Sequence, residues 1–236
     1  MMPLKASSMD LEQFGEDIWI ASGPTVTSAG FRYPTRMAVI RLGSGLFIWS
    51  PTALVPDLRA EVDALGEVRF VAAPNSLHGA FLPDWSKAYP QAALYAAPGS
   101  RKARPDITFD TDLGDEPDPA WSSEIDQAVM HGNMITSEVV FFHCKSRTVL
   151  FTDLIQHFPP GWFGGMQALI ARLDGMTGAE PQVPQKFRVA FNNRKAARAS
   201  LERILAWPAE KVVMAHAEPV REDGRAFIER AFRWLR

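Results

Sequence analysis

Cysteine, long apolar runs and an excess of positive charge are scarce or absent in this sequence. Its one cysteine, Cys144, has no partner for an internal disulfide, which suits a reducing compartment. The longest apolar runs, EVVFFH and TVLFTDLI, fall far short of the roughly 20 residues of a membrane-spanning helix. The opening segment MMPLKASSMDLEQFG lacks the apolar core of a secretory signal. We therefore expect a cytoplasmic protein that does not cross a membrane.

Opposite charges nearly balance over the whole chain. Lysine and arginine number 25 and aspartate and glutamate 27, which leaves a net charge of -2. This balance removes the broad positive field on which non-specific nucleic-acid binding depends, so nucleic acid is not an expected partner. A small-molecule substrate and a protein partner both remain open. With 47% apolar residues among 236, the chain can bury a full core, and we expect one domain over residues 1–236.

Short strands separated by turn residues are predicted in the first half. Segments 17–22, 36–42 and 45–50 are rich in β-branched and aromatic residues, and the turn at 43–45 is typical of a hairpin. Residues 52–66 carry apolar side chains at helical spacing and stop at a glycine. The pattern then predicts a strand over 67–74, a helix around 82–90, a strand over 92–98, and a loop with short edge strands over 99–119.

The second half repeats this arrangement with more helix at its end. Strands are predicted over 124–130, 137–143 and 148–154, helices around 162–173 and 194–207, a strand over 211–216 and a closing helix over 224–236. Two β-rich blocks, each followed by helices, predict two sheets stacked face to face with helices outside. The expected fold is α/β, a four-layer αββα sandwich.

Four polar residues stand where these strands end or turn. His78 follows the strand over 67–74, Asp153 closes the strand over 148–154, His216 ends the strand over 211–216, and His131 precedes the strand over 137–143. These positions and the order of elements resemble the metallo-β-lactamase fold superfamily over nearly the whole chain. The resemblance implies that His78, Asp153, His216 and His131 are metal ligands.

The loop of the superfamily that is richest in ligands, His-x-His-x-Asp-His, is much altered here. In that register this sequence reads Ser76-Leu77-His78-Gly79-Ala80-Phe81, which retains one of the four ligands. The chain is most similar to an uncharacterised group within the superfamily whose function is unknown. The residues that carry this similarity are Ser50-Pro51 in FIWSPTAL, Pro74, Asn75 and His78 in PNSLH, and the block FFHCKSRTVLFTDL.

A single metal is the most that this ligand set implies. Two imidazoles and one carboxylate, with an open fourth position, are sufficient for one zinc or similar divalent ion, which could lower the pKa of a bound water to about 7. A second metal would lack ligands at Ala80 and Phe81. No other cofactor is expected.

Each candidate also has a purely structural interpretation. His78 could hydrogen-bond its own turn, Asp153 could cap the following segment, and His216 could satisfy a loop carbonyl. His131 fits a solvent-facing or turn-bonding role better. His143 and Cys144 are expected to be structural, and His157 could line the cleft but matches no ligand position. The segment 161–165 could cover the cleft or simply lead into a helix.

Three functions follow from these alternatives. The first is a protein with a degenerate metal site, whose hydrolase activity is lost or much reduced and whose catalytic residues are unknown. The second is a single-metal hydrolase that uses His78, Asp153 and His216. The third is a non-catalytic binding or scaffold protein. The replaced ligands and Ser50-Pro51 favour the first.

Overall fold

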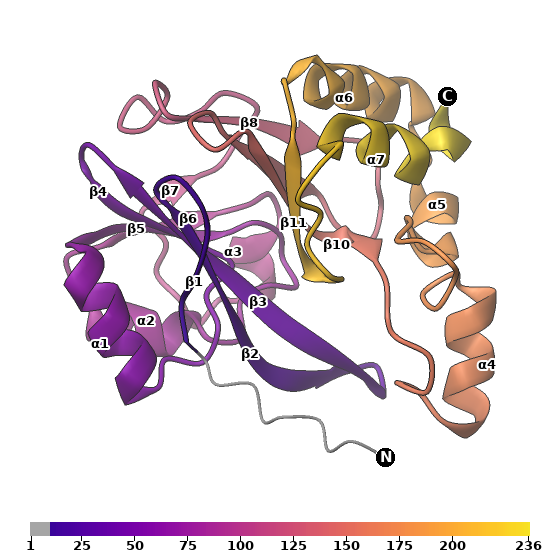
Figure 1. Ribbon diagram of the computed structural model, residues 1–236, viewed down its shortest axis with the longest axis horizontal. Coiled ribbons are helices and arrows are strands. Elements are labelled where there is room, and N and C mark those ends of the chain that lie inside the picture. The colour runs from indigo at the N-terminus through magenta and orange to yellow at the C-terminus, as the bar shows by residue number, and fades with distance from the viewer. Residues whose placement is uncertain (1–9) are drawn as a thin grey trace.

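Two β-sheets face each other in the computed structural model, which describes residues 10–236 (Figure 1). The first sheet contains seven strands in chain order, antiparallel from β1 to β4 and parallel from β4 to β7. These strands are β1 (Glu12–Gly15), β2 (Ile18–Ser28), β3 (Phe31–Leu42), β4 (Gly45–Trp49), β5 (Val68–Ala73), β6 (Ala93–Ala96) and β7 (Thr111–Asp112).

The second sheet has four strands, ordered β11, β10, β9, β8. Neighbours are antiparallel except for the parallel pair β10 and β11. The strands are β8 (Ile125–Met130), β9 (Glu138–His143), β10 (Thr148–Gln156) and β11 (Lys211–His216).

Helices lie on the outer side of each sheet (Figure 1). Those that follow strands of the first sheet are α1 (Pro56–Leu65), α2 (Leu82–Ala88) and α3 (Ser100–Ala103). After the strands of the second sheet come α4 (Gly165–Leu173), α5 (Gln185–Ala190), α6 (Arg194–Ala206), α7 (Gly224–Ala231) and the 3-10 turn η1 (Arg233–Leu235). Over residues 10–236, no helix combines the length and apolar character needed to cross a membrane.

Three apolar layers hold the sandwich together. In β3, Met37 and Val39 face α1 and α2, whereas the alternate residues Ala38 and Ile40 face the second sheet, as the two-residue period of a strand requires. The layer between the sheets contains large aromatic rings such as Phe141. A third layer packs β8 to β11 against α6 and α7. The predicted αββα architecture is confirmed.

The β2–β3 hairpin is much longer than the sequence predicts. Expected strands over 17–22 and 36–42 extend to Ile18–Ser28 and Phe31–Leu42. Glycine and proline between them read as a loop, but the pairing continues through a register shift between Gly23 and Val26. The tip is held by tertiary contact, because Phe31 packs edge-on against Phe163 with ring centroids 5.3 Å apart. Such a contact has no local sequence signal.

Other boundaries differ less from the prediction. The first helix begins at Pro56 rather than at residue 52, since proline is suited to the first helical turn. The segment 99–119, predicted as loop or short edge strands, contains the short edge strand β7, whereas the helices α3 and α5 were not predicted. The predicted hairpin turn at 43–45 is confirmed by the pair Leu42 with Gly45, and a second hairpin joins β9 to β10 through the pair His143 with Thr148.

The ends of four strands meet at one edge of the sandwich. Ser50 follows β4 and the loop 75–78 follows β5, its parallel neighbour in the first sheet. Asp153 lies in β10 and His216 ends β11, its parallel neighbour in the second sheet. Since parallel strands end at the same edge of a sheet, side chains at this edge converge between the two sheets.

Candidate metal centre

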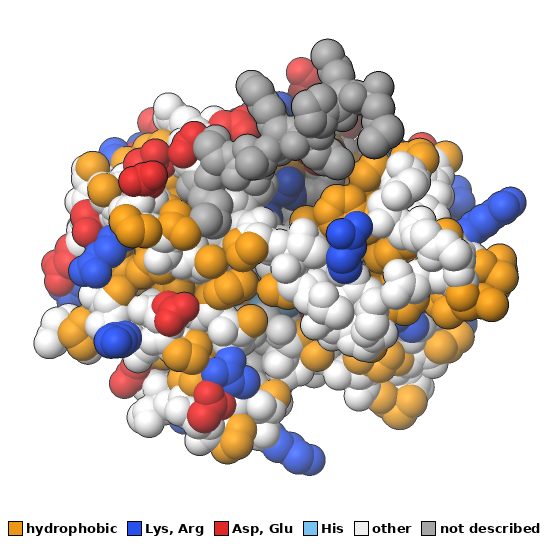
Figure 2. All heavy atoms as spheres, turned by 90° about the horizontal axis from the view of Figure 1, so that it is seen from below, with side chains coloured by type: hydrophobic (Ala, Val, Ile, Leu, Met, Phe, Trp, Pro, Cys, Tyr) orange, Lys and Arg blue, Asp and Glu red, His pale blue; other side chains and the backbone are white. Residues whose placement is uncertain are grey.

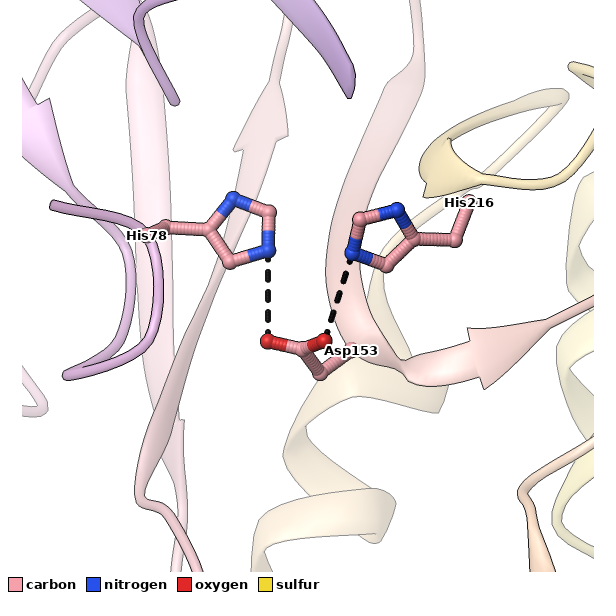
Figure 3. Close-up of side chains that lie close together, drawn as sticks. All are labelled: His78, Asp153 and His216. Carbon is pink, nitrogen blue, oxygen red and sulfur yellow. Dashed lines mark ion pairs between the residues drawn. The ribbon is translucent and has the colours of Figure 1, made fainter. Parts of the chain in front are cut away.

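His78, Asp153 and His216 form a compact cluster between the sheets (Figure 3). The Nε2 atom of His78 lies 3.2 Å from Oδ2 of Asp153, and Nε2 of His216 lies 3.3 Å from Oδ1 of the same carboxylate. The three side chains are 5–9% exposed, and each offers a ligand atom within 4.8 Å of the others. Two imidazoles therefore flank one buried carboxylate.

Glu138 holds the segment of β10 that carries Asp153. Here the pairing of β10 with β11 is interrupted, so backbone N–H groups need other partners. The buried carboxylate of Glu138 accepts the N–H of Thr152 at 2.6 Å, of Asp153 at 2.8 Å and of Leu154 at 3.0 Å. Burial, with the nearby charge of Asp153, raises the pKa of Glu138 to about 7. No local pattern in the sequence indicates this role of Glu138.

Asn75 joins the histidine loop to the same segment. It is fully buried, and its Nδ2 donates to Oδ2 of Asp153 at 2.7 Å and to Oγ1 of Thr152 at 2.8 Å. Its Oδ1 accepts the N–H of Leu77 at 2.7 Å and of His78 at 3.1 Å. An asparagine that bonds to backbone two and three residues ahead is a known turn signal, so the sequence PNSLH could have indicated the turn but not its partner strand.

The hydrogen bond of His216 determines which of its ring nitrogens carries a proton. Nδ1 lies 2.8 Å from the carbonyl oxygen of Pro34, and because a carbonyl only accepts, Nδ1 is the donor. In the neutral ring Nε2 is then an acceptor, yet it faces the carboxylate oxygen of Asp153. Two acceptors in contact require a cation, either a proton on Nε2 or a metal ion between the two groups.

The second imidazole is oriented by a hydroxyl. Nδ1 of His78 lies 2.8 Å from Oγ of Ser50, and since a hydroxyl both donates and accepts, either neutral tautomer of His78 fits. Burial alone would raise the pKa of Asp153, but the charges of His78 and His216 and their hydrogen bonds outweigh it and hold the pKa of Asp153 well below its usual range. Asp153 is therefore the anionic member of the cluster.

The cluster lies at the wall of a cavity of about 240 Å³. Apolar side chains dominate its lining, and Lys186 adds a positive charge. Figure 2 shows apolar side chains gathered over this side of the molecule, with a small histidine surface in the hollow at the centre. The larger apolar members of the lining are Val26, Tyr33, Leu77, Phe81, Ile135 and Phe187.

The structure does not bring His131 to the other three candidates. Its Nε2 pairs with the carboxylate of Asp115 at 2.8 Å at the surface, just beyond the end of β8. His143 is buried against Ser146, with Nδ1 to Oγ at 2.7 Å, and His157 bonds the carbonyl of Gly178 at 2.9 Å. His143 thus has the structural contact expected for it.

Other residues singled out in the sequence lie near the cavity or at the surface. Ala80 and Phe81 are part of the lining, and Cys144 is exposed. The segment 161–165 leads into α4, where Phe163 is buried against Phe158 with ring centroids 5.0 Å apart. It therefore has the packing of an approach to a helix.

One family model and several solved structures match this chain. The family model described as domain of unknown function (DUF4336) matches residues 26–163. No curated protein matches the sequence. The chain is similar to the metallo-β-lactamase from Pontibacter korlensis, with a TM-score of 0.64 at 11% identity, covering 97% of this chain and 99% of the other.

Two further solved structures are similar over almost their full lengths. The metallo-β-lactamase FIM-1 from Pseudomonas aeruginosa, in its mono-zinc form, has a TM-score of 0.63 at 12% identity, covering 98% of this chain and 97% of that one. The metallo-β-lactamase from Hirschia baltica has a TM-score of 0.64 at 13% identity, covering 96% and 97%. At this identity the likeness establishes the fold alone.

Proposed function

The chain belongs to the family described as domain of unknown function (DUF4336) and has the metallo-β-lactamase fold, and from that premise we propose that it is a single-metal hydrolase. His78, Asp153 and His216 would hold one zinc or similar divalent ion. The observation that carries this proposal is the contact between Nε2 of His216 and Oδ1 of Asp153 at 3.3 Å. With Nδ1 of His216 donating to Pro34, this contact takes either a proton on Nε2 or a metal ion, and the third ligand atom, from His78 and within 4.8 Å of the other two, favours the metal.

The donor set suits a zinc ion. Zinc bonds imidazole nitrogen and carboxylate oxygen at about 2.0–2.2 Å, so two ligands of a tetrahedral site lie about 3.3–3.6 Å apart. The two nitrogen–oxygen separations at Asp153, 3.2 Å from His78 to Oδ2 and 3.3 Å from His216 to Oδ1, are each close to that spacing. Three protein ligands leave a fourth position for water or substrate. The mono-zinc form of FIM-1 supports occupancy by one metal on this fold.

The surrounding residues orient the ligands. A divalent metal supplies Lewis acidity and lowers the pKa of bound water to about 7. Pro34 holds the ring of His216 through its carbonyl and Ser50 holds the ring of His78 through its hydroxyl. Asn75 and Glu138 fix Asp153 from its side chain and its backbone. Such outer contacts raise metal affinity by keeping ligands in place, and the apolar cavity would accept an apolar part of the substrate.

A second metal has no support among the described residues of this loop. Ala80 and Phe81 offer no ligand atom. At Gly79 an added Cβ would lie 3.1 Å from Cγ of Arg104, and the carbonyl of Gly79 accepts a hydrogen bond from that guanidinium. A larger side chain at Gly79 would crowd Arg104, so this position suits glycine. The proposal is therefore limited to one metal.

Metal content tests the proposal directly. Untagged protein would be loaded with zinc, desalted and measured by plasma mass spectrometry. We expect about one zinc per chain in the wild type and a large loss in His78→Ala and in His216→Ala. His131→Ala is the matched control, because it removes a histidine that also pairs with a carboxylate but lies outside the cluster, and its zinc content should equal that of the wild type.

Two results would contradict the proposal. Wild-type protein that retains no zinc would leave the interpretation of a degenerate site with lost activity. An equal loss in His131→Ala would mean that zinc binds elsewhere. Thermal unfolding of each variant, measured without metal, separates loss of a ligand from loss of the fold.

A further inference from the structure

Ser50, His78 and Asp153 form a continuous series of polar contacts, a hydrogen bond between Ser50 and His78 and an ion-pair contact between His78 and Asp153. Oγ of Ser50 lies 2.8 Å from Nδ1 of His78, and Nε2 of the same ring lies 3.2 Å from Oδ2 of Asp153. In the tautomer that donates from Nε2 to the carboxylate, Nδ1 accepts the hydroxyl proton of Ser50. A hydroxyl, an imidazole and a carboxylate joined in this order are the groups of a nucleophilic hydrolase.

The backbone of Ser50 is strained where the side chain enters the cavity. Its φ is +49°, a left-handed value that is uncommon for a residue with a side chain, and the following Pro51 restricts it further. Strain of this kind persists where neighbours impose it. The N–H of Ser50 bonds Ala72 at 3.1 Å, and the carbonyl of Thr52 accepts Nε1 of Trp85 at 2.7 Å. Contacts on both sides thus hold Ser50 at the end of its strand.

The same cavity can hold an acyl group. Ser50, His78 and Asp153 all belong to its lining, together with apolar side chains and the positive charge of Lys186. We propose that Ser50 is a nucleophile in the metal-free protein, with His78 as its base and Asp153 orienting His78. The substrate class is a carboxylic ester of a small apolar acid, whose acyl group lies against Leu77 and Phe81.

The reaction consumes one water molecule for each ester that is cleaved. Oγ of Ser50 attacks the ester carbonyl carbon while its proton passes to Nδ1 of His78. The bond from carbon to the alcohol oxygen then breaks, and His78 gives that proton to the leaving alcohol. Water next attacks the acyl carbon and loses a proton to His78, the bond to Oγ breaks, and Ser50 regains the proton. The products are the free acid and the alcohol.

The metal and the nucleophile require different tautomers of His78. A metal held through Nε2 of His78 and the carboxylate of Asp153 would displace the contact between them and leave the ring proton on Nδ1. That proton would be donated to Oγ of Ser50, and the hydroxyl would lose its base. Zinc should therefore slow the reaction of Ser50, a relation that separates this inference from the proposed metal function.

The experiment is covalent labelling of the whole chain by an alkyl fluorophosphonate, read by intact mass and peptide mapping. Protein stripped with a chelator should gain one adduct on Ser50, and none in Ser50→Ala. His78→Gln should react about 10²-fold or more slowly, because a positioned base contributes about that factor. Ser146→Ala is the matched control, since Ser146 makes a similar contact with His143, 2.7 Å, on the turn after β9. It should be labelled like the wild type.

Each outcome decides for or against the nucleophile. A wild type that gains no adduct while a known serine hydrolase reacts fully overturns the inference, even if zinc binds. The inference is also overturned if His78→Gln is labelled as fast as the wild type. The same holds if the labelling rate is unchanged in protein shown by mass spectrometry to hold zinc. In both cases Ser50 would react without His78 as its base. Labelling of Ser50 in a chain that never binds zinc would support the inference and reject the metal proposal.

Discussion

At the scale of single residues, burial decides the protonation state of His143. Its side chain is 1% exposed and its Nδ1 contacts Oγ of Ser146. Burial lowers the pKa of His143 to about 4, against smaller opposing charge effects from Asp17 and Glu16. The ring is therefore neutral in the folded protein down to a pH at which an exposed histidine is charged.

Because of this lowered pKa, His143 should make the folded protein less stable in acid. The folded pKa lies below the unfolded value of about 6.5, so the unfolded chain takes up a proton first as the pH falls. The contribution of His143 is complete above pH 6.5 and is lost toward pH 4, by up to about 3 kcal/mol. His143→Gln lacks this titration. Urea unfolding of both proteins from pH 7 to pH 4 should show the wild type losing its advantage over the variant, and parallel curves would contradict the assignment.

At the scale of elements, the irregular part of β10 depends on β9. Glu138 begins β9 and accepts three backbone N–H groups from the segment that carries Asp153. A regular strand would have paired those groups with β11, but the register between β10 and β11 is interrupted there. The site therefore exists because a buried carboxylate stabilises a departure from regular pairing.

Replacing this carboxylate should affect both stability and metal binding. In Glu138→Gln one amide oxygen remains for three N–H groups, and the new NH₂ faces donors. We expect a loss of about 2–4 kcal/mol in the free energy of unfolding, because a buried group without a partner costs about 1–3 kcal/mol. Zinc affinity should fall about tenfold or more, as is common when an outer contact to a ligand is removed.

Glu124, a carboxylate near the surface that also accepts a backbone N–H, is the control for Glu138. Glu124 accepts the N–H of Gly43 through both oxygens, at 3.1 and 3.2 Å, in an exposed position. Glu124→Gln should change the unfolding free energy by less than about 0.5 kcal/mol and leave zinc affinity unaltered. Equal effects of the two substitutions, measured by urea unfolding and zinc titration, would show that the position of Glu138 is unimportant.

At the scale of the whole molecule, the cluster connects the two sheets. His78 lies in a loop of the first sheet, whereas Asp153 and His216 come from two strands of the second (Figure 3). The sheets also meet through Arg36 of β3, whose guanidinium donates to the carbonyl of Met214 at 2.7 Å. A metal bound by all three ligands would stabilise the folded sandwich, because the unfolded chain does not hold the ligands together.

Zinc should therefore raise the unfolding temperature of the apoprotein. Free zinc at 100 times its dissociation constant adds about 2.7 kcal/mol, which corresponds to about 5–10 °C for a chain of this size. The measurement is a thermal unfolding scan with and without zinc. His216→Ala should show little of this shift and His131→Ala all of it. A wild type with no shift would mean that zinc does not bind across the sheets.

The sequence identifies the layers of this protein and three members of its cluster. Alternating apolar residues and helical spacing are local properties, so the order of elements and the αββα fold follow from them together with the family resemblance. His78, Asp153 and His216 were expected because the family resemblance places ligands at these strand ends. The long β2–β3 hairpin and α5 were missed, since their stability comes from packing against distant residues.

Only the tertiary structure decided how the polar groups pair. The partners of the site are far apart in the chain, such as Asn75 with Asp153 and His216 with Pro34, and no local pattern specifies them. His131 stands apart because the turn after β8 places it beside Asp115. The contact of Ser50 with His78 likewise arises where β4 and β5 end together. Hydrogen bonds between distant segments depend on how the two sheets pack, and that packing is determined by the whole core.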